Sequence, residues 1–193
     1  MRSRFIVPYV VLIVAVVVFV SSRSLSAQMA GMNAPAAPSD ADLIKSAMAA
    51  APAAVSEHAT VMAVDAQMQP HVLREGTNGW TCIPDNPVSP GPDPMCVDKN
   101  GLEWMKAYMA HQDPPKDLVG FGYMLMGGSD ASNDDPYASG PAAGRQWVDT
   151  GAHVMLFNPG DRLAGYPTTA ENPKAPYVMW ANTPYAHLMI PVK

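Results

Sequence analysis

The feature that most restricts the fold is a pair of cysteines that encloses a proline-rich segment. Cys82 and Cys96 are the only cysteines in the chain, and residues 83–95 between them contain five prolines. Proline lacks a backbone N–H and has a fixed φ, so this segment is not expected inside a sheet or a helix. In an oxidising compartment the two cysteines are expected to form a structural disulfide. Because they are not in a C-x-x-C arrangement, a redox role is the less favoured interpretation.

The first 27 residues have the three parts of a secretory signal peptide. Arg2 and Arg4 make a basic start, residues 5–20 form an apolar run, and small residues precede a cleavage site after Ala27. The run is shorter than the roughly 20 residues that a membrane-spanning helix needs, so an uncleaved anchor is the weaker alternative. We therefore expect a bacterial protein that is periplasmic or secreted and has no membrane attachment after signal cleavage.

Cleavage would leave a strongly acidic chain. The full sequence has 12 Lys and Arg and 17 Asp and Glu, and three of the arginines belong to residues 1–27, so the mature chain carries 9 basic and 17 acidic residues. Its net charge of −8 and its lack of a basic cluster argue against nucleic acid and anionic membranes as partners. Apolar residues make up 48% of the sequence, which argues against a disordered chain.

Two helices are predicted in the mature chain. Residues 28–38 are rich in Ala, Met, Gly and Pro and indicate a flexible leader, and residues 39–193 are expected to form a single domain. Ser39 and Asp42 have the spacing of a capping box before a helix at residues 41–51. A second helix is expected at residues 98–111, where Leu102, Met105 and Met109 would form a buried apolar stripe beside Trp104 and Tyr108.

Short apolar runs predict the sheet. Strands are expected at residues 59–64, 70–73, 118–126, 152–157, 177–181 and 186–190, and residues from Gly127 to Gly144 are expected to form a long loop. The last two runs predict a hairpin. The expected fold class is α+β, with two main helices packed on a largely antiparallel sheet of four to six strands and with one disulfide.

Three segments resemble uncharacterised exported bacterial proteins that have no established activity. These segments are LREGTNGWTC at residues 73–82, GGSDASN at residues 127–133 and TPYAHLMIP at residues 183–191. The resemblance spans most of the mature chain. It implies export and implies nothing about chemistry.

Histidine and methionine alternate on two of the predicted strands. His153 and Met155 are two residues apart, as are His187 and Met189. Residues i and i+2 of a strand lie on the same face, so each pair would present an imidazole and a thioether together. Met124 and Met126 repeat this spacing on a third predicted strand. Imidazole and thioether ligands suit Cu(I), which makes copper a candidate cofactor. Packing in the core is the simpler interpretation, because methionine fills irregular gaps well.

The predicted loop offers a second candidate site. Asp130, Ser132 and Asp134 alternate like the first oxygen ligands of a calcium loop. Asp135 occupies the sixth position, where an EF-hand has glycine, and Pro141 occupies the twelfth, where it has glutamate, so an EF-hand is excluded. A looser calcium site is one hypothesis, and a solvated turn is the simpler one.

An enzyme is the remaining alternative. A hydrolase triad could combine Ser129 with His153 or His187 and with Asp130 or Asp149, but the G-x-S-x-G pattern is missing around Ser129. No motif places a nucleophile, a base and an orienting group at a diagnostic spacing. The favoured expectation is therefore a non-enzymatic envelope protein that binds an unknown ligand or protein partner. The alternatives are a periplasmic copper-binding protein and a hydrolase.

Overall fold

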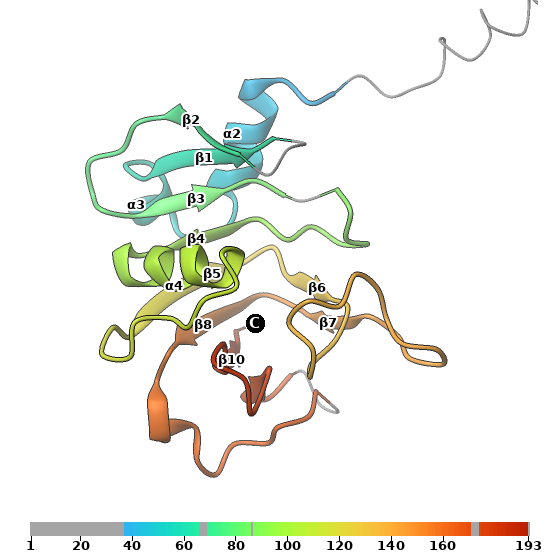
Figure 1. The fold of residues 1–193 in the computed structure, drawn as a ribbon. Coiled ribbons are helices and arrows are strands. Elements are labelled where there is room, and N and C mark those ends of the chain that lie inside the picture. The colour runs from blue at the N-terminus through green and yellow to red at the C-terminus, as the bar shows by residue number, and fades with distance from the viewer. Residues whose placement is uncertain (1–36, 66–68, 86, 171–173, 193) are drawn as a thin grey trace, which may run out of the picture. The chain divides into compact units, whose positions relative to one another are not determined.

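The computed structural model describes residues 37–65, 69–85, 87–170 and 174–192 (Figure 1). The predicted signal peptide at residues 1–27 and nearly all of the predicted leader at residues 28–38 lie outside these residues. Both therefore stay predictions, and so does the domain boundary at residue 39.

The described part of the chain forms three α-helices and one 3₁₀ turn. These are α2 (Asp40–Met48), α3 (Ala53–Ser56), α4 (Lys99–Met109) and η1 (Gly160–Leu163). The predicted capping box is confirmed, because Ser39 accepts from the N–H of Asp42 and Asp42 accepts from the N–H of Ser39. Among the described residues, no helix is both long enough and apolar enough to cross a membrane.

The main sheet has eight strands in the order β2-β1-β3-β4-β5-β8-β10-β9 (Figure 1). Their bounds are β1 Thr60–Val64, β2 Pro70–Arg74, β3 Thr81–Ile83, β4 Met95–Val97, β5 Gly120–Met124, β8 His153–Phe157, β9 Tyr177–Met179 and β10 His187–Pro191. All neighbouring strands are antiparallel except β1 and β3, which are parallel. The α+β class is confirmed, and the expected size of four to six strands is wrong.

The missed strands have only three residues each. The ends of the proline-rich segment, Ile83 and Met95, do join the sheet as parts of β3 and β4, while its prolines lie between these strands. A second, two-stranded sheet pairs β6 (Gly128–Asp130) with β7 (Val148–Thr150). The expected long loop therefore contains a strand. Three residues are too few for an alternating pattern to be recognised in the sequence.

Helix α4 is held directly against strand β5. Asp98 caps the helix, and its Oδ1 accepts from the N–H of Gly101 at 2.7 Å and from the N–H of Phe121 at 3.1 Å. The backbones touch as well, because a Cβ on Gly120 would lie 2.6 Å from the Cα of Gly101. Glycine at both positions lets the helix approach the sheet closely. This contact sets which face of α4 is buried.

The buried face of α4 differs from the predicted stripe. Trp104 is the large side chain at its centre, with 4% of its surface exposed, whereas Met109 is 40% exposed. Leu102 and Met105 are partly buried beside the core. The stripe is displaced because the Gly101–Gly120 contact turns Trp104 toward the sheet.

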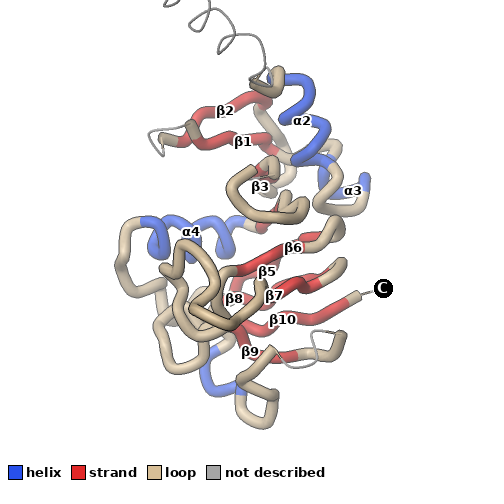
Figure 2. The backbone as a smooth tube through the Cα atoms, turned by 90° about the vertical axis from the view of Figure 1, so that its right-hand side faces the viewer, coloured by secondary structure: helices blue, strands red, loops and turns tan. Residues whose placement is uncertain are grey.

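The two faces of the sheet carry separate clusters of apolar side chains. Cys96 and Val97 are adjacent on β4 and both fully buried, so they point to opposite faces. Val97 packs with Trp104 of α4, and Cys96 belongs to a cluster with Ala47 of α2 and with Ala50 just after this helix. Figure 2 shows α2 and α3 beside β1 and β3, and α4 on the other side of the sheet.

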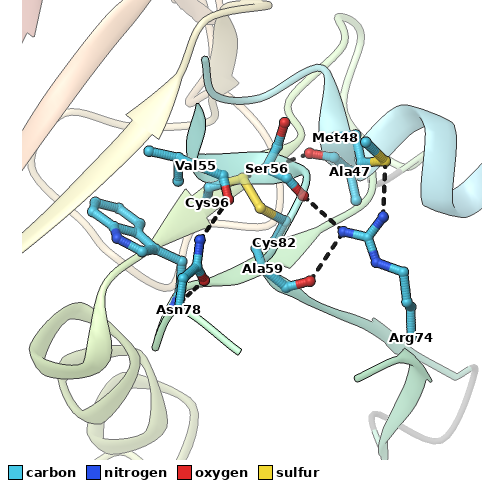
Figure 3. The surroundings of a disulfide bond; sticks show 10 residues. Ala47, Met48, Val55, Ser56, Ala59, Arg74, Asn78, Cys82 and Cys96 are labelled. Carbon is cyan, nitrogen blue, oxygen red and sulfur yellow. Dashed lines mark hydrogen bonds between the residues drawn. A yellow bond between two sulfur atoms is a disulfide. The ribbon is translucent and has the colours of Figure 1, made fainter. Parts of the chain in front are cut away.

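The predicted disulfide between Cys82 and Cys96 is present. The two residues lie directly opposite each other on β3 and β4. Next to it, the guanidinium of Arg74 donates to the carbonyl oxygens of Ser56 at 2.7 Å and Ala59 at 3.0 Å (Figure 3). These bonds connect strand β2 to the last residue of α3 and to the residue before β1.

Candidate functional site

The predicted histidine and methionine residues lie on one buried face of the sheet, the face that α4 covers. Residues of one strand that are two apart share this face, and so do residues that are opposed on neighbouring strands. Reading across β5, β8, β10 and β9, the opposed pairs on this face are Met124–His153, Met155–Met189 and Met179–His187. All six side chains are buried. We call these six residues the His/Met face.

A cavity of about 140 Å³ lies over this face. Its lining residues are Asp93, Met95, Trp104, Met105, Tyr108, Met124, Ser129, Asp130, Met155, Phe157, Met179, Trp180, His187 and Met189. Six of the fourteen methionines of the chain are among them. Thioether sulfur is therefore the most abundant donor atom that a molecule or ion in this cavity would meet.

Met155 and Met189 have room to face each other because of a glycine. Gly122 on β5 lies opposite Met155, and a Cβ there would be 3.0 Å from the terminal methyl of Met155 and 2.9 Å from the ring of Phe157. Any other residue at this position would displace one of these two side chains. The glycine thus keeps space beside the opposed methionines.

Aromatic rings close the cavity on the side of α4. The ring centroid of Trp104 lies 5.3 Å from that of His187 and 4.6 Å from that of Phe157. Trp180 stacks parallel to Trp104 at 6.2 Å. Trp180 has a φ of 55°, a left-handed conformation that is rare for a bulky residue, and its N–H and Nε1–H donate to the carbonyls of Asn133 and Ser132. This conformation ends β9 earlier than the sequence pattern predicts.

His187 is a neutral imidazole whose free nitrogen is its Nε2. The pKa of His187 is lowered to about 4, mainly by burial and to a smaller extent by the charge of His153, and the hydrogen bond to Tyr185 opposes this shift. Its Nδ1 lies 2.9 Å from the carbonyl oxygen of Tyr185. A carbonyl can only accept, so Nδ1 carries the hydrogen and Nε2 keeps its lone pair. A histidine held in this way by a backbone carbonyl has the tautomer and orientation of a metal ligand.

His153 has the same arrangement at the other end of the His/Met face. Burial lowers its pKa, and its Nδ1 donates to the carbonyl oxygen of Gly151 at 2.7 Å. The Nε2 of His153 is buried and has no hydrogen-bond partner among the residues that the structure describes. His153 does not line the cavity, which sets it apart from Met155, His187 and Met189.

The two histidines are too far apart to share one ion with the methionines between them. His153 lies opposite Pro191, and His187 is four residues from Pro191 along β10. Strand geometry therefore separates the Cα atoms of the histidines by roughly 14 Å. Three of the four residues predicted to bind copper line the cavity, namely Met155, His187 and Met189. His153 is not among the lining residues.

Met126 does not belong to the His/Met face. Strand β5 ends at Met124, and Met126 lies beyond it with 50% of its surface exposed. The predicted Met124–Met126 pair on one strand face is therefore wrong. The residues that the sequence did not connect to this site are Met95, Met105 and Met179, because they come from β4, α4 and β9.

A carboxyl group also lines the cavity. The pKa of Asp130 is raised to about 7, mainly by burial and to a smaller extent by the negative charge of Asp93. Both residues belong to the lining. The cavity therefore combines apolar walls with one carboxyl group that is close to half ionised at neutral pH.

The residues of the predicted calcium loop lie at two different cavities. Ser132 and Asp134 line an open hollow of about 1030 Å³, whereas Asp130 lines the smaller cavity over the His/Met face. The Oγ of Ser132 accepts from the N–H groups of Asp134 at 3.1 Å and Asp135 at 3.0 Å, which is a turn. Among the described residues, no three His, Cys, Asp or Glu side chains are grouped as a metal site. A calcium site at this loop stays a prediction.

Ser129, the nucleophile of the hydrolase hypothesis, also lines the methionine cavity. It lies opposite Asp149 in the β6–β7 pair. Across the part of the chain that the structure describes, no hydrogen bond joins its Oγ to the ring of His153 or His187. The triad stays a prediction without a contact that supports it.

Searches against protein-family models, curated proteins and solved structures found no match to this chain. The resemblance to exported bacterial proteins accordingly stays a prediction. The function has to be argued from the chemistry of the site alone.

Proposed function

We propose that this chain is an exported, non-enzymatic binding protein that holds Cu(I) at the cavity over the His/Met face. The ligands are the sulfur atoms of Met155 and Met189 and the Nε2 of His187. The observation that supports this proposal is the opposition of the two methionines on β8 and β10, with the lone pair of a neutral histidine at the same cavity.

The donor atoms select for a soft ion. Thioethers bind hard ions such as calcium and magnesium poorly, whereas thioether and imidazole together suit Cu(I). His187 needs no deprotonation before it binds, because its low pKa keeps it neutral. The Asp130 carboxyl at the cavity can offset the positive charge of the ion in these apolar surroundings.

The aromatic side chains at the cavity also favour Cu(I). Trp104 covers His187, and a cation close to the face of an indole is attracted by its π-electrons. A cavity of about 140 Å³ has room for a dehydrated ion and little space for a larger ligand.

Export is part of this proposal. The disulfide between Cys82 and Cys96 supports an oxidising compartment. The predicted signal peptide at residues 1–27 supports the bacterial envelope or the exterior, where a soft-metal protein would meet copper.

Replacing both opposed methionines by leucine tests the proposal. The Met155→Leu/Met189→Leu protein is expected to bind Cu(I) roughly 10- to 100-fold more weakly than the wild type, because leucine has the size of methionine and no donor atom. Affinity is measured anaerobically by competition with a chromophoric Cu(I) chelator, and near-UV circular dichroism verifies folding.

The matched control is Met109→Leu/Met126→Leu, which changes two exposed methionines. This protein should keep the wild-type affinity. A wild type that takes no Cu(I) from the chelator would contradict the proposal. Equal losses in the test and control proteins would also contradict it, because they would show that surface methionines bind the ion.

A further inference from the structure

The end of the His/Met face at His153, which we call the inner end, has a nitrogen atom that could bind a metal ion and that the proposed site does not use. The side chain of His153 is fully buried, and its Nε2 is an acceptor without a partner among the described residues. An unpaired acceptor in the interior is costly, so proteins rarely keep one without a use. The hydrogen bond from Nδ1 to Gly151 fixes the direction in which Nε2 points.

A methionine sulfur lies on the same side of His153. Met124 is directly opposite His153 in the β5–β8 pair. A Cβ on Gly128 would lie 3.3 Å from the Cε1 of His153 and 3.5 Å from the Sδ of Met124. The methyl group of Met124 would be 2.8 Å from the same Cβ, so the ring of His153 and the thioether of Met124 both lie beside Gly128.

We infer that His153 and Met124 form a second position for Cu(I) on the His/Met face. This inference rests on the proposed function and adds a second ion to it. Nε2 of His153 and Sδ of Met124 supply the two ligands, and Cu(I) accepts two-coordinate sites of imidazole and thioether. Met124 also lines the cavity, so its flexible side chain connects the two positions.

The two positions use different residues of β8. His153 belongs to the inner position and Met155 to the outer one, and these residues are two apart, roughly 7 Å along the strand, so two bound ions repel each other. The inner position also has fewer ligands than the outer one. The second equivalent of Cu(I) is therefore expected to bind roughly 10-fold or more weakly than the first.

The test is to count Cu(I) equivalents. The folded wild type is titrated anaerobically with Cu(I) against a chromophoric chelator, and the methionine methyl groups are followed by NMR with ¹³C-labelled methionine. The wild type is expected to bind two equivalents, and the second is expected to shift the methyl signal of Met124. Met124→Leu is expected to bind one equivalent with the first affinity unchanged, because the substitution conserves volume. Met126→Leu, two residues further along the chain and exposed, is the control that keeps both.

The outcomes separate this inference from the proposed function. If the wild type binds one equivalent of Cu(I) and Met124→Leu does not change this binding, the site at Met155, Met189 and His187 remains and the position at His153 and Met124 is overturned. The partner of His153 would then be water. Two equivalents in both the wild type and Met124→Leu would also overturn it, because the second ion would then bind elsewhere. No binding in the wild type would overturn both claims.

Discussion

Acidification from about pH 7 to about pH 4 is expected to destabilise an Asp130→Asn protein by about 3 kcal/mol through His187 alone. The pKa of His187 is lowered from 6.5 to about 4 in the folded state by burial. Between these two pH values the unfolded chain takes up a proton that the folded protein does not. The stability that His187 contributes is therefore fully present above pH 6.5 and is lost as the pH falls toward 4.

The Asp130→Asn background is needed because Asp130 acts in the opposite direction. Burial raises the pKa of Asp130 from 3.8 to about 7, so the folded protein holds a proton that the unfolded chain releases. Its contribution to stability is present below pH 3.8 and is lost as the pH rises through 7. In the wild type the two effects oppose each other between pH 4 and pH 6.5, so acidification is expected to cost less stability there than in Asp130→Asn.

The control for this prediction is Asp130→Asn/His187→Asn. The amide of asparagine can replace the Nδ1–H of His187 as a donor to Tyr185, and it does not titrate. Urea unfolding at a series of pH values gives the stability of each protein. If both proteins lose stability in parallel on acidification, the account of His187 as a buried neutral imidazole is wrong.

Removing the disulfide by Cys82→Ala/Cys96→Ala is expected to lower the free energy of unfolding by about 3 kcal/mol. The cross-link closes a loop with a sequence separation of 14 residues, and its loss gives the unfolded chain more conformational freedom. Both cysteines are fully buried in a cluster of small apolar side chains that includes Ala47 of α2, so lost packing adds to the effect. Urea unfolding of the oxidised wild type and of the variant measures the difference.

The control is Val88→Ala, a change at an exposed residue within the same loop. It should alter the stability by no more than about 0.5 kcal/mol. The disulfide variant should still bind Cu(I) when folded, because the cysteines and the His/Met face lie on opposite faces of the sheet. An unchanged unfolding midpoint without the disulfide would contradict the prediction.

The parts of the fold that the sequence predicted are those with local signals. The capping box at Ser39 marks the start of α2, an apolar stripe indicates α4, and apolar runs mark β1, β5, β8 and β10. Strands β3 and β4 gave no such signal. They depend on pairing with distant strands and on the disulfide, and these non-local interactions leave no periodic pattern in three residues.

The sequence predicted only those parts of the candidate site that lie within a single strand. Spacing alone placed His153 with Met155 and His187 with Met189. How the two pairs meet depends on the register between β8 and β10, and the sequence does not show it. Because the strands are antiparallel and the methionines are opposed, the histidines necessarily lie at opposite ends. The register therefore places Met155 opposite Met189 and separates the two imidazoles.

X-ray absorption spectroscopy of the wild type loaded anaerobically with one equivalent of Cu(I) tests the central claim most directly. We predict a copper shell with two sulfur atoms and one histidine nitrogen, from Met155, Met189 and His187. The sulfur contribution should disappear in Met155→Leu/Met189→Leu and persist in Met109→Leu/Met126→Leu. A shell of nitrogen and oxygen alone would contradict the claim that the opposed methionines of β8 and β10 bind the ion.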